Sequence, residues 1–147
     1  MLNRIPVKGN LVKRGVNVGC VLCPMCINEE EDVDHLLFRY SFAKEIWRWF
    51  GNWSSFNLPA IQNFESFINH DESLNNDKKV RKLFWALVYA TLWYIWGARN
   101  DCIFKNKKAN SMKTADDMQL ISFNWLKNRG NFRNLNWHEW CTSPNCF

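Results

Sequence analysis

The feature that most constrains this chain is a pair of cysteines followed by a histidine. Cys23 and Cys26 are separated by two residues, one of them a proline, and at this spacing a tight turn can direct both thiolates toward one tetrahedral metal ion. His35 follows nine residues after Cys26, directly before an apolar run. Thiolate and imidazole are the ligands that structural zinc sites use. The sequence therefore predicts three ligands of such a site between Cys23 and His35.

The fourth ligand of this site is the part that the sequence leaves open. A cysteine a few residues after His35 would complete the tetrahedral set, but Tyr40 stands there. A phenol is a poor zinc ligand because its pKa of about 10 keeps it protonated at neutral pH. Cys20 is an alternative ligand, since it extends the series to Cys-x-x-Cys-x-x-Cys. The series also resembles part of an iron–sulfur motif, but the fourth cysteine that such a motif needs a few residues later is missing.

The rest of the chain predicts a mainly helical domain around this turn. From Leu83 to Ala98 nearly every residue is apolar, which indicates a long central helix over residues 78–104, covered on most sides. The run is shorter than the roughly 20 apolar residues of a membrane span and has charges at both ends, so a buried helix is favoured over a transmembrane one. Other helices are expected at residues 41–50, capped by Ser41 and ended by Gly51, near 64–68, and at 111–129, capped by Ser111 and ended by Gly130.

These elements predict a single small helical domain in which a zinc-knuckle-like turn near the N-terminus packs on a long Trp-rich helix. Nine tryptophans are unusual at this length and favour a helical core built from large rings. Within the domain, residues 1–52 form the knuckle-like region and first helix, and residues 53–77 a loop with a short helix. Residues 78–147 hold the central helix, another helix and an aromatic tail. This tail is expected to be irregular, and either to fold back over the helices or to fray.

Several stretches of the sequence carry a resemblance to a known family. They are Arg4-Ile-Pro-Val-Lys8 with Asn10-Leu-Val-Lys-Arg-Gly15, then Cys-Pro-x-Cys, the acidic run, Asp-His-Leu and Phe-Ala-Lys-x-Ile-Trp, and finally Leu92-Trp-Tyr-Ile-Trp-Gly-Ala-Arg-Asn100 with Phe104 trailing. Together they resemble the zinc-binding domain near the C-terminus of plant LINE-type (non-LTR) retrotransposon reverse transcriptases. The likeness covers most of the chain.

The resemblance implies a zinc-binding domain detached from its polymerase. In the family, the fourth metal ligand is a cysteine at the place of Tyr40, so zinc binding is expected to be weak or lost here. A full-length parent would be an RNA-directed DNA polymerase whose polymerase region precedes this segment. The domain would then hold element RNA or target DNA for that adjoining region.

Catalytic motifs do not stand out in the sequence. It has no Gly-rich phosphate loop, no Gly-x-Ser-x-Gly elbow, no His-Glu-x-x-His and no Tyr-x-Asp-Asp polymerase signature. His70 and His138 lie beside acidic residues in polar stretches, where surface positions are the ordinary interpretation. The sequence predicts a domain that is not an enzyme.

The charge distribution predicts a nucleic-acid partner. The net charge is +5, and the acidic residues between positions 29 and 34 form one block, so the basic residues are segregated from them. A segregated basic surface can neutralise phosphates, and any exposed tryptophan can stack on an unpaired base. The candidate RNA- or DNA-binding residues are Lys8, Lys13 and Arg14 before the knuckle, and Arg99, Lys105, Lys107 and Lys108 after the central helix.

Two other interpretations of these surfaces stay open. The basic residues are equally consistent with an ordinary solvated surface, and exposed aromatic residues would suit a protein-interaction module with a decayed metal site. No signal peptide follows Met1, and the Cys-x-x-Cys pattern with a nearby histidine suits a reducing compartment. An intracellular protein of the nucleus or cytoplasm is therefore expected. Cys102, Cys141 and Cys146 are expected to be ordinary thiols.

Overall fold

A computed structural model describes residues 4–58, 60–74, 77–129, 132 and 134–144. It confirms the mainly helical fold, and its one β-type pairing within these ranges is an isolated bridge between Leu22 and Glu30. The elements in chain order are α1 (Lys8–Lys13), the π-helix η2 (His35–Arg39), α2 (Ser41–Ser54), α3 (Glu65–Ser73), α4 (Lys78–Lys105), α5 (Ser111–Arg129) and α6 (Trp137–Thr142).

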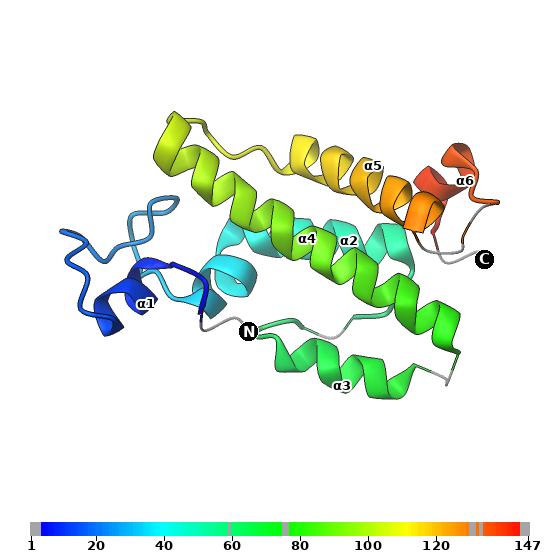
Figure 1. Cartoon of the computed structure of the whole chain (residues 1–147), viewed down its shortest axis with the longest axis horizontal. Helices are drawn as coiled ribbons and strands as arrows, with labels where there is room; N and C mark the ends of the chain where they lie inside the picture. Colours follow the sequence, from blue (N-terminus) through cyan, green and yellow to red (C-terminus); the bar gives the residue numbers. More distant parts are fainter. Residues whose placement is uncertain (1–3, 59, 75–76, 130–131, 133, 145–147) are drawn as a thin grey trace.

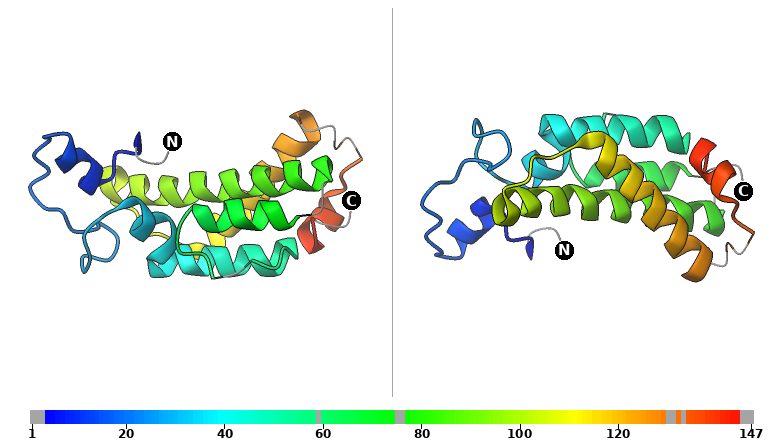
Figure 2. Two further views of the ribbon diagram at one scale, coloured as in Figure 1. Left: turned by 90° about the horizontal axis from the view of Figure 1, so that it is seen from below. Right: turned by 90° about the horizontal axis from the view of Figure 1, so that it is seen from above.

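Helix α4 runs along the molecule, with α2 and α5 beside it and α3 along another side (Figure 1). Its 28 residues span about 42 Å at a rise of 1.5 Å per residue. The segment with α1 and the cysteine loop lies at the end where α4 finishes, and α6 lies at the opposite end, as the views from below and above also show (Figure 2). The knuckle-like region is thus packed on one end of a helical body.

The bounds of α4 agree closely with the predicted 78–104. Asp77 begins the helix, because its side chain accepts hydrogen bonds from the backbone N–H groups of Lys79 and Val80. Asn106 ends it in the left-handed conformation, with φ of 51°. The other helices cover α4 less completely than predicted, however, since Trp93 is 65% exposed. None of the helices in the described ranges has the length and hydropathy that crossing a membrane requires.

The core is built from large rings contributed by α2, α3 and α4. Trp47 on α2 lies against Phe67 on α3 with ring centroids 4.7 Å apart, and Phe56 meets Phe84 on α4 edge-on at 5.1 Å. All four residues are buried. Each such ring buries about 150–250 Å² of surface, so these contacts supply much of the apolar burial that holds the helices together. This agrees with the Trp-rich core expected from the sequence.

The C-terminal segment folds back over the helices, one of the two outcomes predicted, and it is more ordered than expected. It forms α6, whose first turn is capped by Asn136 through a 2.8 Å hydrogen bond from the backbone N–H of His138. Trp140 is fully buried, and its carbonyl accepts a 2.8 Å hydrogen bond from the indole Nε1 of Trp53. The indole Nε1 of Trp140 donates in turn to the carbonyl of Gln119 on α5. These bonds hold α6 against α2 and α5.

Some predicted helix ends were wrong. Gly51 does not end α2, which continues to Ser54 and stops at Ser55 with φ of 58°. A glycine inside a helix costs only about 1 kcal/mol, and burying Trp53 in the extra turn offsets that cost. Ser41 makes no side-chain cap, and the cap of α5 is Asn110, which accepts from Lys113 N, rather than Ser111. The predicted ending at Gly130 lies outside the described residues.

Candidate metal centre

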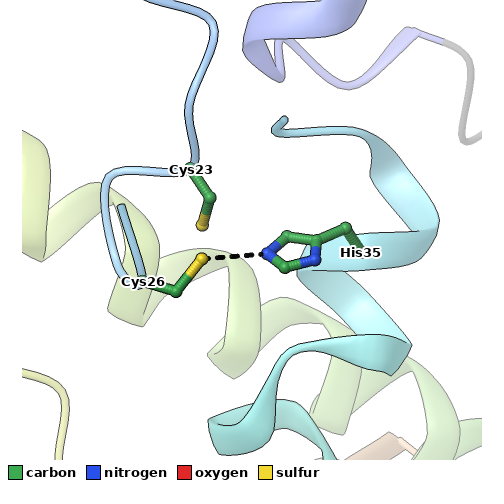
Figure 3. Close-up of side chains that lie close together, drawn as sticks. All are labelled: Cys23, Cys26 and His35. Carbon is green, nitrogen blue, oxygen red and sulfur yellow. Dashed lines mark hydrogen bonds between the residues drawn. The ribbon is translucent and has the colours of Figure 1, made fainter. Parts of the chain in front are cut away.

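The structure brings together the three side chains that the sequence singled out. The sulfur atoms of Cys23 and Cys26 and a ring nitrogen of His35 all lie within 4.8 Å of one another (Figure 3). Cys26 Sγ and His35 Nε2 lie 3.4 Å apart. Cys23 and His35 are buried, and Cys26 is half-buried. Two sulfurs and one nitrogen at this separation form a donor set that suits a tetrahedral metal such as zinc.

The cysteines are held in a closed loop. The backbone N–H of Cys23 donates to the carbonyl of Glu29 at 2.7 Å, and Ile27 N donates back to the carbonyl of Cys23 at 2.9 Å. Burial raises the pKa of the Cys23 thiol, while hydrogen bonds from the backbone amides of Met25 and Cys26 act in the opposite direction. Amides directed at a sulfur stabilise its thiolate form, which is the form that binds metal. These amides therefore offset part of the effect of burial on the Cys23 thiol.

His35 is oriented by two acidic side chains from the run that precedes it. Its backbone N–H donates to Asp32 Oδ1 at 2.6 Å, and its ring Nδ1 lies 3.1 Å from Glu29 Oε2. With Nδ1 bound to a carboxylate, the other ring nitrogen, Nε2, faces Cys26. Histidines that bind metals in proteins almost always have this second carboxylate or carbonyl partner. The sequence showed these acids as a block of charge, and their position between the cysteines and the histidine was the signal for this second role.

A single turn of π-helix brings residue 40 to the same site. In η2 the backbone N–H of Tyr40 donates to the carbonyl of His35 at 2.7 Å, which is the i to i+5 bond of a π-helix. Five residues along an α-helix would place the two side chains about 140° apart around the axis. Here the rings of His35 and Tyr40 lie with centroids 5.8 Å apart. Position 40 is therefore close to the ligands, as a fourth ligand must be.

Tyr40 occupies that position as a hydrogen-bond donor. Its hydroxyl donates to the carbonyl of Met25, inside the cysteine loop, at 3.2 Å. Burial raises the pKa of the Tyr40 phenol, and the neighbouring Cys23 and Cys26 raise it further. The phenol therefore stays protonated at neutral pH and closes the loop without supplying a ligand.

The other cysteines in the described part of the chain do not join the ligands. Cys20, the alternative fourth ligand, is exposed and is not part of the cluster of metal-ligating atoms in the described ranges. Cys102, on α4, packs against the loop from outside, with its sulfur 3.7 Å from the Pro24 carbonyl. Cys141 is half-buried, and Cys146 lies outside the described residues.

A buried ion pair joins this region to the helical body. Arg99 on α4 donates from Nε to Glu31 Oε1 and from Nη2 to Glu31 Oε2, both at 2.8 Å. The side chains are 6% and 0% exposed. Glu31 also accepts a 2.8 Å bond from the backbone N–H of Lys8, and its carbonyl accepts one from Gly9. A Cβ at position 9 would lie 2.9 Å from the Glu31 carbonyl oxygen. Glycine at this position therefore allows α1 to approach the backbone of Glu31. One carboxylate thus ties α1, the loop after the cysteines and α4 together.

Two of the seven candidate nucleic-acid-binding residues, Arg99 and Lys8, make contacts within the fold. Arg99 is taken up by Glu31 and by the face of Trp96, 4.9 Å away, which corrects its expected place among the exposed cations. Lys8 donates from Nζ to the Leu22 carbonyl at 2.8 Å. Lys13 and Arg14 are exposed near the end of α1, and Lys105, Lys107 and Lys108 are exposed at the end of α4.

The cations at the end of α4 lie beside an exposed tryptophan. Trp93, Lys107 and Lys108 line a shallow hollow of about 250 Å³ between α4, the following loop and α5. Asp101 and Asp117 also line the hollow, but each forms an ion pair with a lysine. Asp101 lies 2.6 Å from Lys105 Nζ, and Asp117 lies 2.9 Å from Lys113 Nζ. Lys107 and Lys108 make no ion pair within the described part of the chain.

Comparison with known proteins supports the metal centre. Residues 1–47 match the family described as zinc-binding in reverse transcriptase, a segment that contains all three converging ligands and Tyr40. The match confirms the resemblance to a reverse-transcriptase zinc-binding domain over these residues, and the stretch from Leu92 to Phe104 lies outside it. No curated protein and no solved structure matches the chain.

Proposed function

We propose that this domain is a non-enzymatic nucleic-acid-binding module, derived from a reverse transcriptase, in which Cys23, Cys26 and His35 hold zinc weakly. The observation that carries the nucleic-acid part is an exposed tryptophan beside two unpaired lysines. Trp93 is 65% exposed and shares its hollow with Lys107 and Lys108. RNA or DNA with unpaired bases is the partner that this combination suits, because an aromatic face stacks on bases and lysines neutralise phosphates.

The zinc part is supported by the donor set and its orientation. Two sulfurs and one imidazole nitrogen converge, and Glu29 holds the imidazole so that its free nitrogen faces the sulfurs. When bound, zinc supplies a structural cross-link and draws the thiols into their thiolate form. The ligands come from two elements, the cysteine loop and η2. A metal held by these three residues would therefore stabilise the loop against the first turn of the helical body.

Binding to single-stranded RNA is expected to weaken log-linearly with salt and to depend on Lys107 and Lys108. Each phosphate contact contributes about 0.7 to the slope for a single strand, so the double variant Lys107→Gln/Lys108→Gln should lower the slope by about 1.4. Trp93→Ala should weaken binding by about 1–3 kcal/mol with an unchanged slope, because stacking releases no ions. Fluorescence anisotropy titrations with a labelled oligonucleotide at several salt concentrations measure both effects.

The control for this experiment removes the same charge elsewhere. Lys78 and Lys82 are exposed at the start of α4, and their double glutamine variant has the same net charge as the Lys107/Lys108 variant. It should leave the slope unchanged. A binding constant that does not respond to salt would contradict the proposal and favour the protein-interaction module, whose apolar contacts lack this dependence.

We also propose that the chain by itself has no polymerase or nuclease activity, because it lacks the corresponding signatures. The purified protein should extend no primer on an RNA template and should leave labelled RNA and DNA intact. Primer-extension and nuclease gels with added Mg²⁺ or Mn²⁺ check this. Template-dependent incorporation that copurifies with the chain through successive columns would contradict it.

A further inference from the structure

A second hollow lies between α2 and the segment that follows it. It has a volume of about 780 Å³, within the range of sites that hold small molecules. Its inner wall is apolar, because the half-buried Leu58 and Ile61 line it above the rings of Phe38, Trp47 and Phe56, which are at most 5% exposed. None of these residues belongs to the metal centre or to the hollow beside Trp93. The site therefore needs an explanation of its own.

The outer wall of this hollow is basic and polar. Lys44 and Arg48 are exposed, stand one helical turn apart on α2, and make no ion pair with any described residue. Asn52, Asn57 and Gln62, whose side chains carry amide groups, also line the hollow. No aspartate or glutamate is among the described residues that line it. A ligand with a flat or apolar part and a negative charge would be complementary to these two walls.

We propose that this hollow binds one nucleotide of a single-stranded nucleic acid, with the base inside and the backbone phosphates on Lys44 and Arg48. Unpaired bases present both a flat apolar face and a hydrogen-bonding edge, and proteins recognise them by packing on the face and bonding to the edge. Amides both donate and accept, so Asn52, Asn57 and Gln62 suit such an edge. The proposal rests on the nucleic-acid-binding function above and adds a binding site on different elements.

The test uses the full chain and a small probe, the 5′-phosphorylated dinucleotide pApA. In ¹⁵N-resolved NMR titrations, pApA should shift the side-chain amide signals of Asn52, Asn57 and Gln62. The Lys44→Gln/Arg48→Gln variant should weaken pApA binding by about tenfold or more, since it loses two charge-assisted contacts. The Lys78→Gln/Lys82→Gln variant has the same spacing and the same loss of charge in another helix, and it should bind pApA normally. Inorganic phosphate should compete only weakly, because it has no base.

Three results would overturn this inference. They are amide signals that do not move with pApA, equal affinities for the Lys44/Arg48 variant and its control, and inorganic phosphate that competes as well as pApA. If any of these appears while long RNA still depends on Lys107 and Lys108, the hollow is not a nucleotide site and the proposed function stands. If pApA instead fills the hollow but long RNA ignores Lys107 and Lys108, the hollow is supported and the Trp93 surface is contradicted.

Discussion

Replacing Tyr40 with cysteine is expected to convert weak, substoichiometric zinc binding into tight binding of one ion. Position 40 lies beside His35 because of the π-turn, and its side chain already faces the cysteine loop at Met25. A cysteine there would favour zinc binding more than the phenol does, because its pKa is lower and its sulfur is a softer donor atom. A closed structural site can contribute about 10 kcal/mol or more, whereas three protein ligands leave a position open to water. Metal content after dialysis and thermal unfolding with and without a chelator measure the change.

The matched control is Tyr40→Phe, which keeps the ring and adds no ligand. It should bind zinc no better than the native chain, and a chelator should alter the melting temperature of neither protein appreciably. The Tyr40→Cys protein should instead melt at a higher temperature in a way that the chelator reverses. If Tyr40→Cys gains no affinity, position 40 is not the fourth ligand position. If the native protein already holds one tight zinc, Cys20→Ser should release it, because Cys20 would then have moved in.

The second large effect is expected at the buried ion pair. Arg99→Met should lower the free energy of unfolding by about 3–5 kcal/mol, because it leaves the Glu31 carboxylate buried without its partner. In the double variant Glu31→Gln/Arg99→Met, the charge is gone and the amide oxygen can still accept from Lys8 N. The double variant should recover much of the lost free energy of unfolding, because replacing both members of a buried ion pair is often nearly neutral for stability. Urea unfolding of the two single variants and the double variant gives the coupling between them.

An exposed pair provides the comparison for this cycle. Lys113 and Asp117 lie one turn apart on the surface of α5, so Lys113→Met should change stability little. If Arg99→Met lowered the free energy of unfolding as little as Lys113→Met does, Glu31 would have to be hydrated in solution. The expected difference comes mainly from burial, and the second hydrogen bond between Arg99 and Glu31 adds to it.

The sequence predicted the parts of the fold that depend on local pattern. The length of α4 could be predicted from its nearly unbroken apolar run and from the charged residues at its ends. The extra turn of α2 and the whole of α6 were missed. Both depend on the contact of Trp53 with Trp140, residues 87 positions apart, and no local pattern reports such a contact.

The same distinction applies to the candidate site. Cys23, Cys26 and His35 were found because ligand spacing is a local property. The π-turn that brings Tyr40 beside His35 was not predicted, because sequence periodicity was interpreted with the period of an α-helix. Arg99 was placed on the surface because arginine usually lies there. Its partner, Glu31, is 68 residues away in the block of acids that appeared to be a solvated run.

The long separation between Glu31 and Arg99 also bears on the order of events during synthesis of the protein. The ribosome must add 68 residues after Glu31 before its partner exists, which takes about 3–14 s at 5–20 residues per second. During that interval the cysteine loop has been made, but the arginine that neutralises its neighbouring carboxylate has not. The contact between the cysteine-bearing segment and α4 can therefore form only after most of α4 has been synthesised.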